Sequence, residues 1–188
     1  RLTLEAEVDG KPVTGSGVVE VTYAKAARIL SPGEYGARFR GEAVVLDLGP
    51  RGLLFALLKE GRDSRSAPDY IVLRAFNFPG GALPRPVEEG MRQVARLSGP
   101  LTSLPLLVRF RDINDPLTVE KVDPLDLAAS FGSGAKFTGA TLEILYSALW
   151  PWSWLALRDP LPTVVTSKLS WLPKYDGQQF DGRRFETI

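Results

Sequence analysis

Five oxygen-bearing side chains in the middle of the chain are the first candidates for chemistry, namely Asp112, Asn114, Asp115, Asp123 and Asp126. Carboxylates brought into pairs could bind calcium or serve as the acid and base of a glycosidase. The spacing does not fit a calcium loop, because the glycine and the distal glutamate of such a loop are lacking and a proline follows Asp115. We therefore interpret the group as an Asx turn followed by the N-cap of a helix.

Two arginines precede this turn on one predicted strand. Arg109 and Arg111 are two residues apart, so both lie on the same face of the strand. A guanidinium can bind a carboxylate through two parallel hydrogen bonds, which suits either a substrate clamp or a structural ion pair. We favour a structural network of Arg109 and Arg111, with Asp112 and Asp115 forming the turn beside them.

A serine and a lysine stand at the spacing of an acyl-enzyme motif. Ser133 and Lys136 match Ser-x-x-Lys, in which a lysine on the same helical face activates a serine nucleophile. The companion Ser-Asp-Asn and Lys-Thr-Gly strings are missing, and the motif follows the predicted end of a helix instead of opening one. The pattern favours a glycine-rich loop. It does not fit a phosphate-binding loop, which needs a strand before it and a helix after it.

The composition of the 188 residues excludes several familiar chemistries. The chain has neither cysteine nor histidine, so thiol nucleophiles, imidazole bases and metal sites built from thiolate or imidazole are excluded. The 23 basic and 22 acidic residues balance to a net charge of +1 and form no long block, so no nucleic-acid partner is expected. We assign no catalytic residue, no cofactor and no metal.

The most unusual segment of the chain is rich in tryptophan. Three of the four tryptophans occupy alternate positions, which a strand would place on one side. Three interpretations are open: a cover for the domain's own core, an interface with a protein or a membrane surface, and a platform for carbohydrate. The segment is too short to span a bilayer, so a membrane contact would be interfacial. The interface residues would be Leu149, Trp150, Trp152, Trp154, Leu155, Leu157 and Arg158.

The first third of the chain predicts two β-hairpins. Residues 2–8 alternate between apolar and polar, Asp9-Gly10 is typical of a turn, and a return strand is expected over 18–23 after a loose start at Gly15. The second hairpin would join two strongly apolar runs, which we take for central strands, at 43–48 and 53–58 on either side of the turn at 49–52.

Three helices are predicted farther along. A capping box favours a helix over 66–76, and apolar periodicity favours a short amphipathic helix over 87–95, with Val87, Met91, Val94 and Ala95 on one face. The best-delimited helix covers 124–131, with Asp123 as the N-cap, Pro124 at the first helical position and Gly132 as the stop. Further strands are expected over 106–110 and 141–146.

These elements predict an α+β fold, with an antiparallel or mixed β-sheet built from hairpins and two or three short helices. The chain shows no repeat and no alternation of strands with helices that would predict a parallel sheet. We expect one domain over 1–175. The polar tail at 176–188 has little to bury and is expected to extend or to dock elsewhere.

Several strings of the chain resemble a family of short uncharacterised proteobacterial proteins. The strings lie at 104–116, 122–124 and 128–132, and others at 2–8, 15–18, 40–44 and 168–173, so the likeness spans most of the chain. The resemblance implies a membrane-anchored domain that faces the periplasm, with a hydrophobic segment just upstream of the position of Leu2. It implies no activity, no catalytic residue and no cofactor.

Together these features predict a non-catalytic envelope domain. The chain opens at Arg1 and not at methionine, so we expect a longer gene product with a membrane tether upstream. The domain would act as an accessory or structural subunit at the periplasmic face of the bacterial inner membrane. It would dock on a membrane protein complex or on the bilayer surface through the tryptophan-rich segment. The alternative is a cell-wall-directed enzyme that uses carboxylates or the pair Ser133 and Lys136.

Overall fold

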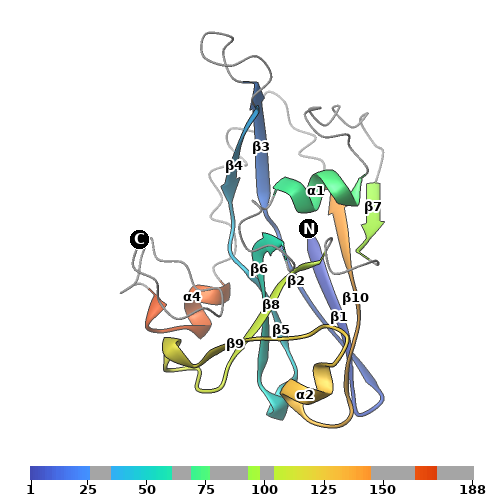
Figure 1. Cartoon of the computed structure of the whole chain (residues 1–188), viewed down its shortest axis with the longest axis vertical. Coiled ribbons are helices and arrows are strands. Elements are labelled where there is room, and N and C mark those ends of the chain that lie inside the picture. Colours follow the sequence, from blue (N-terminus) through green and yellow to red (C-terminus); the bar gives the residue numbers. More distant parts are fainter. Residues whose placement is uncertain (26–34, 61–68, 77–92, 98–103, 145–163, 173–188) are drawn as a thin grey trace.

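Two four-stranded antiparallel sheets and a separate two-stranded ribbon make up most of the described protein (Figure 1). The computed structural model describes residues 1–25, 35–60, 69–76, 93–97, 104–144 and 164–172. The first sheet has the strand order β2-β1-β10-β7, and the second sheet has the order β5-β6-β8-β9. Of the predicted antiparallel or mixed sheet, the antiparallel pairing is confirmed, but the described strands form two sheets and a ribbon instead of one sheet. The described helices are short, so the fold is mostly β and the label α+β fits only roughly.

The bounds of the elements are as follows. The first sheet contains β1 (Leu2–Val8), β2 (Lys11–Gly17), β7 (Gln93–Arg96) and β10 (Ala135–Ile144). The second sheet contains β5 (Val44–Asp47), β6 (Leu53–Glu60), β8 (Pro105–Phe110) and β9 (Val119–Lys121). The ribbon consists of β3 (Glu20–Lys25) and β4 (Tyr35–Arg40). The helices are α1 (Asp69–Ala75), α2 (Leu127–Phe131) and α4 (Val164–Lys168), with the 3-10 turns η1 (Gly49–Arg51) and η2 (Pro116–Thr118).

The first hairpin turns tightly at Asp9 and Gly10, as predicted. Both residues have positive φ, 50° and 78°, which is the backbone of a two-residue hairpin turn. Such a turn places Lys11 directly opposite Val8, so pairing starts at once. The expected return strand over 18–23 is therefore wrong. The partner of β1 is β2, and the later run forms β3, which pairs with β4 in the ribbon.

The second sheet is apolar on both of its faces. One face packs against the first sheet and carries Val44, Leu46, Leu54, Leu107 and Val122. The opposite face carries Phe55, Leu106 and Val108, with Val45 and Phe110 partly buried beside them. Both faces are covered, so β6 and β8, the inner strands of this sheet, need apolar side chains at nearly every position. The predicted hairpin of β5 and β6 is confirmed, although β5 lies at the edge of its sheet.

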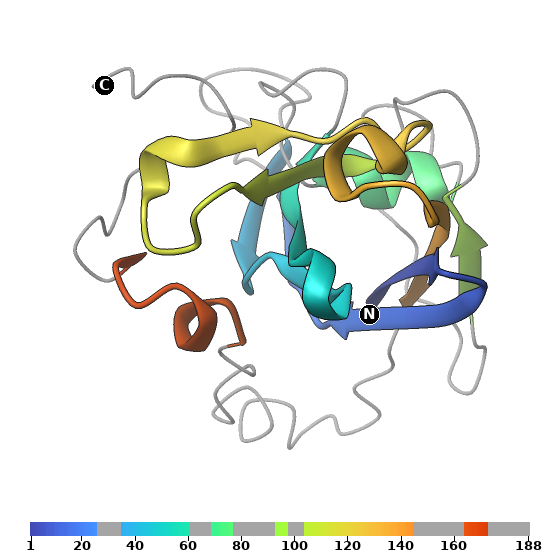
Figure 2. The ribbon, with the colours of Figure 1, turned by 90° about the horizontal axis from the view of Figure 1, so that it is seen from below.

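The helix α4 and the residues that follow it cover the outer face of the second sheet. In Figure 2, α4 lies on the far side of this sheet from β1 and β2. Val165, Leu169 and Trp171 are buried against this face. The backbone N–H of Val165 donates to the carboxylate of Glu42 at 2.9 Å, and the indole N–H of Trp171 donates to the carbonyl of Ile113 at 2.7 Å. We call residues 164–172 the strap, because they fasten this part of the chain to the second sheet.

One of the first two predicted helices differs from the structure. The end of the helix expected over 87–95 is wrong, because Gln93–Arg96 forms β7 and pairs with β10, and residues 87–92 lie outside the described ranges. The tertiary pairing with β10 overrides an apolar periodicity that also suits a helix, and it leaves Val94 exposed. The helix expected over 66–76 is confirmed from Asp69 to Ala75.

The third predicted helix is confirmed as α2, but its N-cap is wrong. Asp126 caps it by accepting from the N–H of Ala129 at 3.1 Å, whereas Asp123 accepts from the N–H of Leu125 in the preceding turn. The stop at Gly132 is confirmed, with a φ of 86° and an N–H that donates to the carbonyl of Ala128. Both aspartates fit N-cap chemistry, and the turn decides which of them is used.

Candidate arginine pocket

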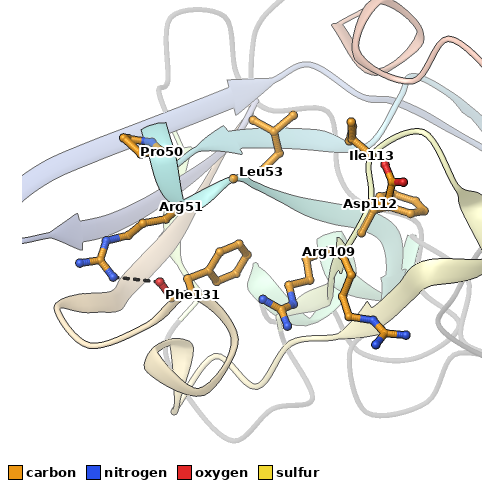
Figure 3. Close-up of a pocket in the computed structure, with 10 residues that line it drawn as sticks. Pro50, Arg51, Leu53, Arg109, Asp112, Ile113 and Phe131 are labelled. Atoms are coloured by element: carbon orange, nitrogen blue, oxygen red, sulfur yellow. Dashed lines mark hydrogen bonds between the residues drawn. The ribbon is translucent and has the colours of Figure 1, made fainter.

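A pocket of about 570 Å³ opens where β8 ends, beside the β5–β6 turn and the end of α2 (Figure 3). Arg109 lines it from β8, Arg111 from the residue that follows the end of β8, and Arg51 from η1. Asp112 also lines it. The apolar part of the lining consists of Pro50, Leu53, Phe110, Ile113 and Phe131.

Arg109 is held by the neighbouring strand and by α2. Its Nε and one terminal nitrogen donate to the same oxygen of Glu120, at 3.0 Å and 2.9 Å. The other terminal nitrogen donates to the carbonyl of Ser130, and the guanidinium lies 5.5 Å from the centre of the Phe131 ring. The last carbonyls of a helix lack partners within the helix, so a cation there is stabilising.

Arg111 shares the carboxylate of Glu120 with Arg109. Its Nε lies 2.8 Å from the second oxygen of Glu120, and its side chain is 65% exposed. Glu120 on β9 lies directly opposite Arg109 on β8, so the register of the two strands places the carboxylate between both arginines. The sequence places both arginines on one strand face, and the structure gives them Glu120 as their common carboxylate, not Asp112 or Asp115.

Asp112 and Asp115 shape the turn that follows β8. A carboxylate oxygen of Asp112 accepts from the backbone N–H of Asn114 at 2.9 Å. A carboxylate oxygen of Asp115 accepts from the N–H of Leu117 at 2.9 Å and caps η2. The hydroxyl of Thr118 also accepts from the N–H of Asp112 at 3.0 Å. The bonds made by the two aspartates are those of Asx turns, in which a short acidic side chain replaces a backbone acceptor.

Arg51 ties the β5–β6 turn to the end of α2 and to the first hairpin. Its terminal nitrogens donate to the carbonyl of Phe131 at 2.9 Å and to Asp9 at 2.7 Å. Sequence reasoning placed Arg51 only in a turn, because its partners are far away in the sequence. The pairing of Arg51 with Asp9 shows how the turns at this end of the two sheets are held together.

The alternative of an enzyme depends on where the carboxylates and the pair Ser133 and Lys136 lie. Among the described residues, the pocket lining contains three arginines and one acid, Asp112, so this part of the chain gives it no pair of carboxylates for acid and base work. Ser133 and Lys136 are exposed, and Lys136 is on β10 opposite Glu7. The intervening Gly134 has a φ of 88°, and its carbonyl accepts from the N–H of Asp9 at 2.9 Å. Ser133 therefore stands in the turn between α2 and β10, and neither it nor Lys136 lines the pocket.

The arginine network predicts unequal effects of two matched substitutions. Arg109→Lys is expected to lower the free energy of unfolding by about 1–2 kcal/mol, because a lysine cannot make the paired bonds to Glu120 and also reach Ser130. Arg111→Lys is expected to cost under ~0.5 kcal/mol, because Arg111 is mostly exposed and water screens its ion pair. Urea unfolding of both variants measures the difference, and equal losses would contradict it.

The tryptophan-rich interface residues lie outside the described residues. Leu149, Trp150, Trp152, Trp154, Leu155, Leu157 and Arg158 all fall in 145–163, and the polar tail falls in 173–188. The fourth tryptophan, Trp171, is part of the strap and is buried in the chain's own interior. Sequence reasoning gave Trp171 no structural role. Val165 and Leu169 are four residues apart, as on one helix face, but Trp171 follows Leu169 by only two, so helical periodicity does not indicate its burial.

The described residues contain neither a group of metal ligands nor a helix that could span a membrane. Within the described ranges, no three side chains of His, Cys, Asp or Glu are grouped closely enough to hold a metal ion. In the same part of the chain, no helix combines the length and the apolar character needed to cross a bilayer.

Comparison with known proteins gives no relative on which to base a function. No family model, no curated protein and no solved structure matches this chain.

Proposed function

We propose that this chain is a non-catalytic envelope domain that docks on a membrane protein complex or on the bilayer surface. The observation that carries the proposal is the tryptophan-rich segment, with Trp150, Trp152 and Trp154 at alternate positions. Indole rings are costly to leave in water and are enriched at the centres of protein interfaces and at the headgroup level of membranes. The resemblance to membrane-anchored proteobacterial proteins supports the periplasmic face of the inner membrane as its location.

The roles of the acidic side chains favour an accessory domain over the enzyme alternative. Glu120 is occupied by two arginines, and Asp112 and Asp115 each accept a backbone N–H in the turn after β8. A catalytic carboxylate must be able to exchange a proton or attack a substrate, and its present bonds would have to break first. These bonds are typical of structural residues.

The tryptophans of the docking segment give the direct test. Replacing Trp150, Trp152 and Trp154 together with serine is expected to lower the membrane-retained fraction about tenfold or more, since truncated aromatic hot spots cost ~2 kcal/mol or more. The measurement is membrane retention of residues 1–188 without an upstream tether, together with co-purification of partner proteins in mild detergent. Circular dichroism and urea unfolding of the same variant report whether the domain still folds.

A matched control removes apolar side chains that are exposed on the described surface. Leu117 and Leu125 are 69% and 83% exposed, and replacing both with serine should leave retention and folding unchanged. Unchanged retention of a folded triple tryptophan variant would refute the docking proposal. Loss of folding in that variant would also refute it, because the three rings would then belong to the domain's own core.

A further inference from the structure

We propose that the arginine pocket at the end of β8 binds a carboxylate that is attached to an aromatic or aliphatic group. The described residues that line this site do not belong to the tryptophan-rich segment, and the test of the site does not depend on the docking function. Its volume of about 570 Å³ lies in the ~300–1,000 Å³ range of small-molecule sites. Figure 3 shows the ring of Phe131 between Arg51 and Arg109, and Arg111 lines the same pocket.

The arginines of the pocket retain hydrogen-bond donors for a ligand. The Nε of Arg111 binds Glu120, and its two terminal nitrogens have no hydrogen bond to any residue in the described ranges. The Nε of Arg51 is likewise without an acceptor there, since its printed partners are reached by the terminal nitrogens. Guanidinium donors pair best with planar carboxylates, because two parallel N–H groups match two oxygens.

The donors are held in place before any ligand arrives. Arg51 is fixed by Phe131 and Asp9, and Arg109 is fixed by Glu120 and Ser130. Arg111 is attached to Glu120 at its Nε, and because the guanidinium is planar this contact also limits the directions of its two terminal nitrogens. A site whose side chains are already ordered loses less conformational entropy on binding.

The balance of charges favours a single carboxylate over a phosphate. The positive charges of Arg51, Arg109 and Arg111 are offset by the carboxylates of Asp9, Glu120 and Asp112, two of which contact these arginines directly. The binding free energy of a ligand therefore depends more on the geometry of its hydrogen bonds than on its total charge. The second negative charge of a phosphate would lie near these carboxylates without a cation to offset it.

The remaining walls of the pocket favour a ligand in which the group that carries the carboxylate is apolar. Pro50, Leu53, Phe110, Ile113 and Phe131 supply apolar surface beside the arginines. Burial of an aromatic or aliphatic group against these side chains adds free energy in proportion to the area removed from water. The ligand class is therefore a small aromatic or aliphatic carboxylate, which includes the carboxyl end of an apolar peptide.

A titration with 3-phenylpropanoate tests the site in the whole chain. We expect saturable shifts of the amide NMR signals of Gly52, Arg111, Ile113 and Phe131. The neutral analogue 3-phenylpropanol should bind about tenfold more weakly, since removing the charge removes the charge-assisted bonds. Inorganic phosphate should give no saturable shift. Equal binding of the alcohol, stronger binding of phosphate, or no saturation with 3-phenylpropanoate would overturn the proposal.

Two arginine variants locate the binding. Arg111→Gln keeps the stem but removes the charge, and it should weaken binding of 3-phenylpropanoate about tenfold. Arg96→Gln is the matched control, because Arg96 is 55% exposed and also pairs with a glutamate, Glu5 at 3.6 Å, on the first sheet. The amide spectrum of each variant reports its folding. Unchanged binding in Arg111→Gln, or equal loss in Arg96→Gln, would remove the pocket as the site.

Discussion

Replacing Trp171 with alanine is expected to lower the free energy of unfolding by about 3–5 kcal/mol, the usual cost of truncating a buried tryptophan. The side chain is only 6% exposed and belongs to the apolar cluster on the outer face of the second sheet. Its ring meets Phe110 edge to face, with centroids 5.3 Å apart, and Phe110 meets Phe55 in the same way at 5.4 Å. Urea unfolding of the whole chain measures the loss.

The loss should extend along the strap beyond Trp171 itself. The strap is a short helix and a few residues, and it has too little regular structure to be stable unless it packs against the sheet. Without the indole, amide hydrogen exchange should become faster at Val165 and Leu169, and strands β1 and β2 of the first sheet should keep their protection. Equal acceleration in both regions would contradict a separate role for the strap.

A conservative variant separates the packing of Trp171 from its hydrogen bond. Trp171→Phe keeps an aromatic ring against Phe110 but removes the N–H that donates to the carbonyl of Ile113. We expect a loss of about 1–2 kcal/mol from the missing bond and the smaller ring. A loss as large as that of the alanine variant would show that the hydrogen bond, and not the buried area, dominates.

The turns and strands of the described fold could largely be predicted, because their signals are local. Asp9-Gly10 indicates a hairpin turn since both residues tolerate positive φ, and the apolar runs of β5 and β6 flank turn residues. What local reasoning could not give is the number of sheets. The pairing of β7 with β10 and the separation of the ribbon from both sheets depend on contacts between residues far apart in the sequence.

The candidate site shows the same division between local and distant signals. Arg109 and Arg111 could be placed on one face from their spacing alone, and Asp112 and Asp115 from the turn chemistry around them. The carboxylate that pairs with both arginines could not be predicted in this way, because the register of β8 with β9 selects Glu120. The contribution of Arg51 to the pocket depends on how the two sheets and α2 come together, and no local pattern reports that arrangement.

The close packing of β2 against β5 gives the second large prediction. A Cβ atom added at Gly15 would overlap the carbonyl oxygen of Val45 and lie 2.9 Å from the Cα of Leu46. Both are backbone atoms of β5, which is hydrogen-bonded to β6 and cannot shift alone. Gly15→Ala is therefore expected to cost about 3 kcal/mol or somewhat more, at the upper end of the range for overpacked cores.

Gly17 provides the matched control on the same strand. A Cβ there would lie 3.0 Å from a methyl carbon of Val44, which is a side-chain atom and can move by rotation. Gly17→Ala is expected to stay within ~1 kcal/mol of the unchanged protein, because a small overlap is offset by the lower entropy of the unfolded chain. Urea midpoints and slopes of the two variants give the comparison. Similar stabilities would mean that β2 and β5 lie farther apart in solution, since only close contact of their backbones makes Gly15 the costlier position.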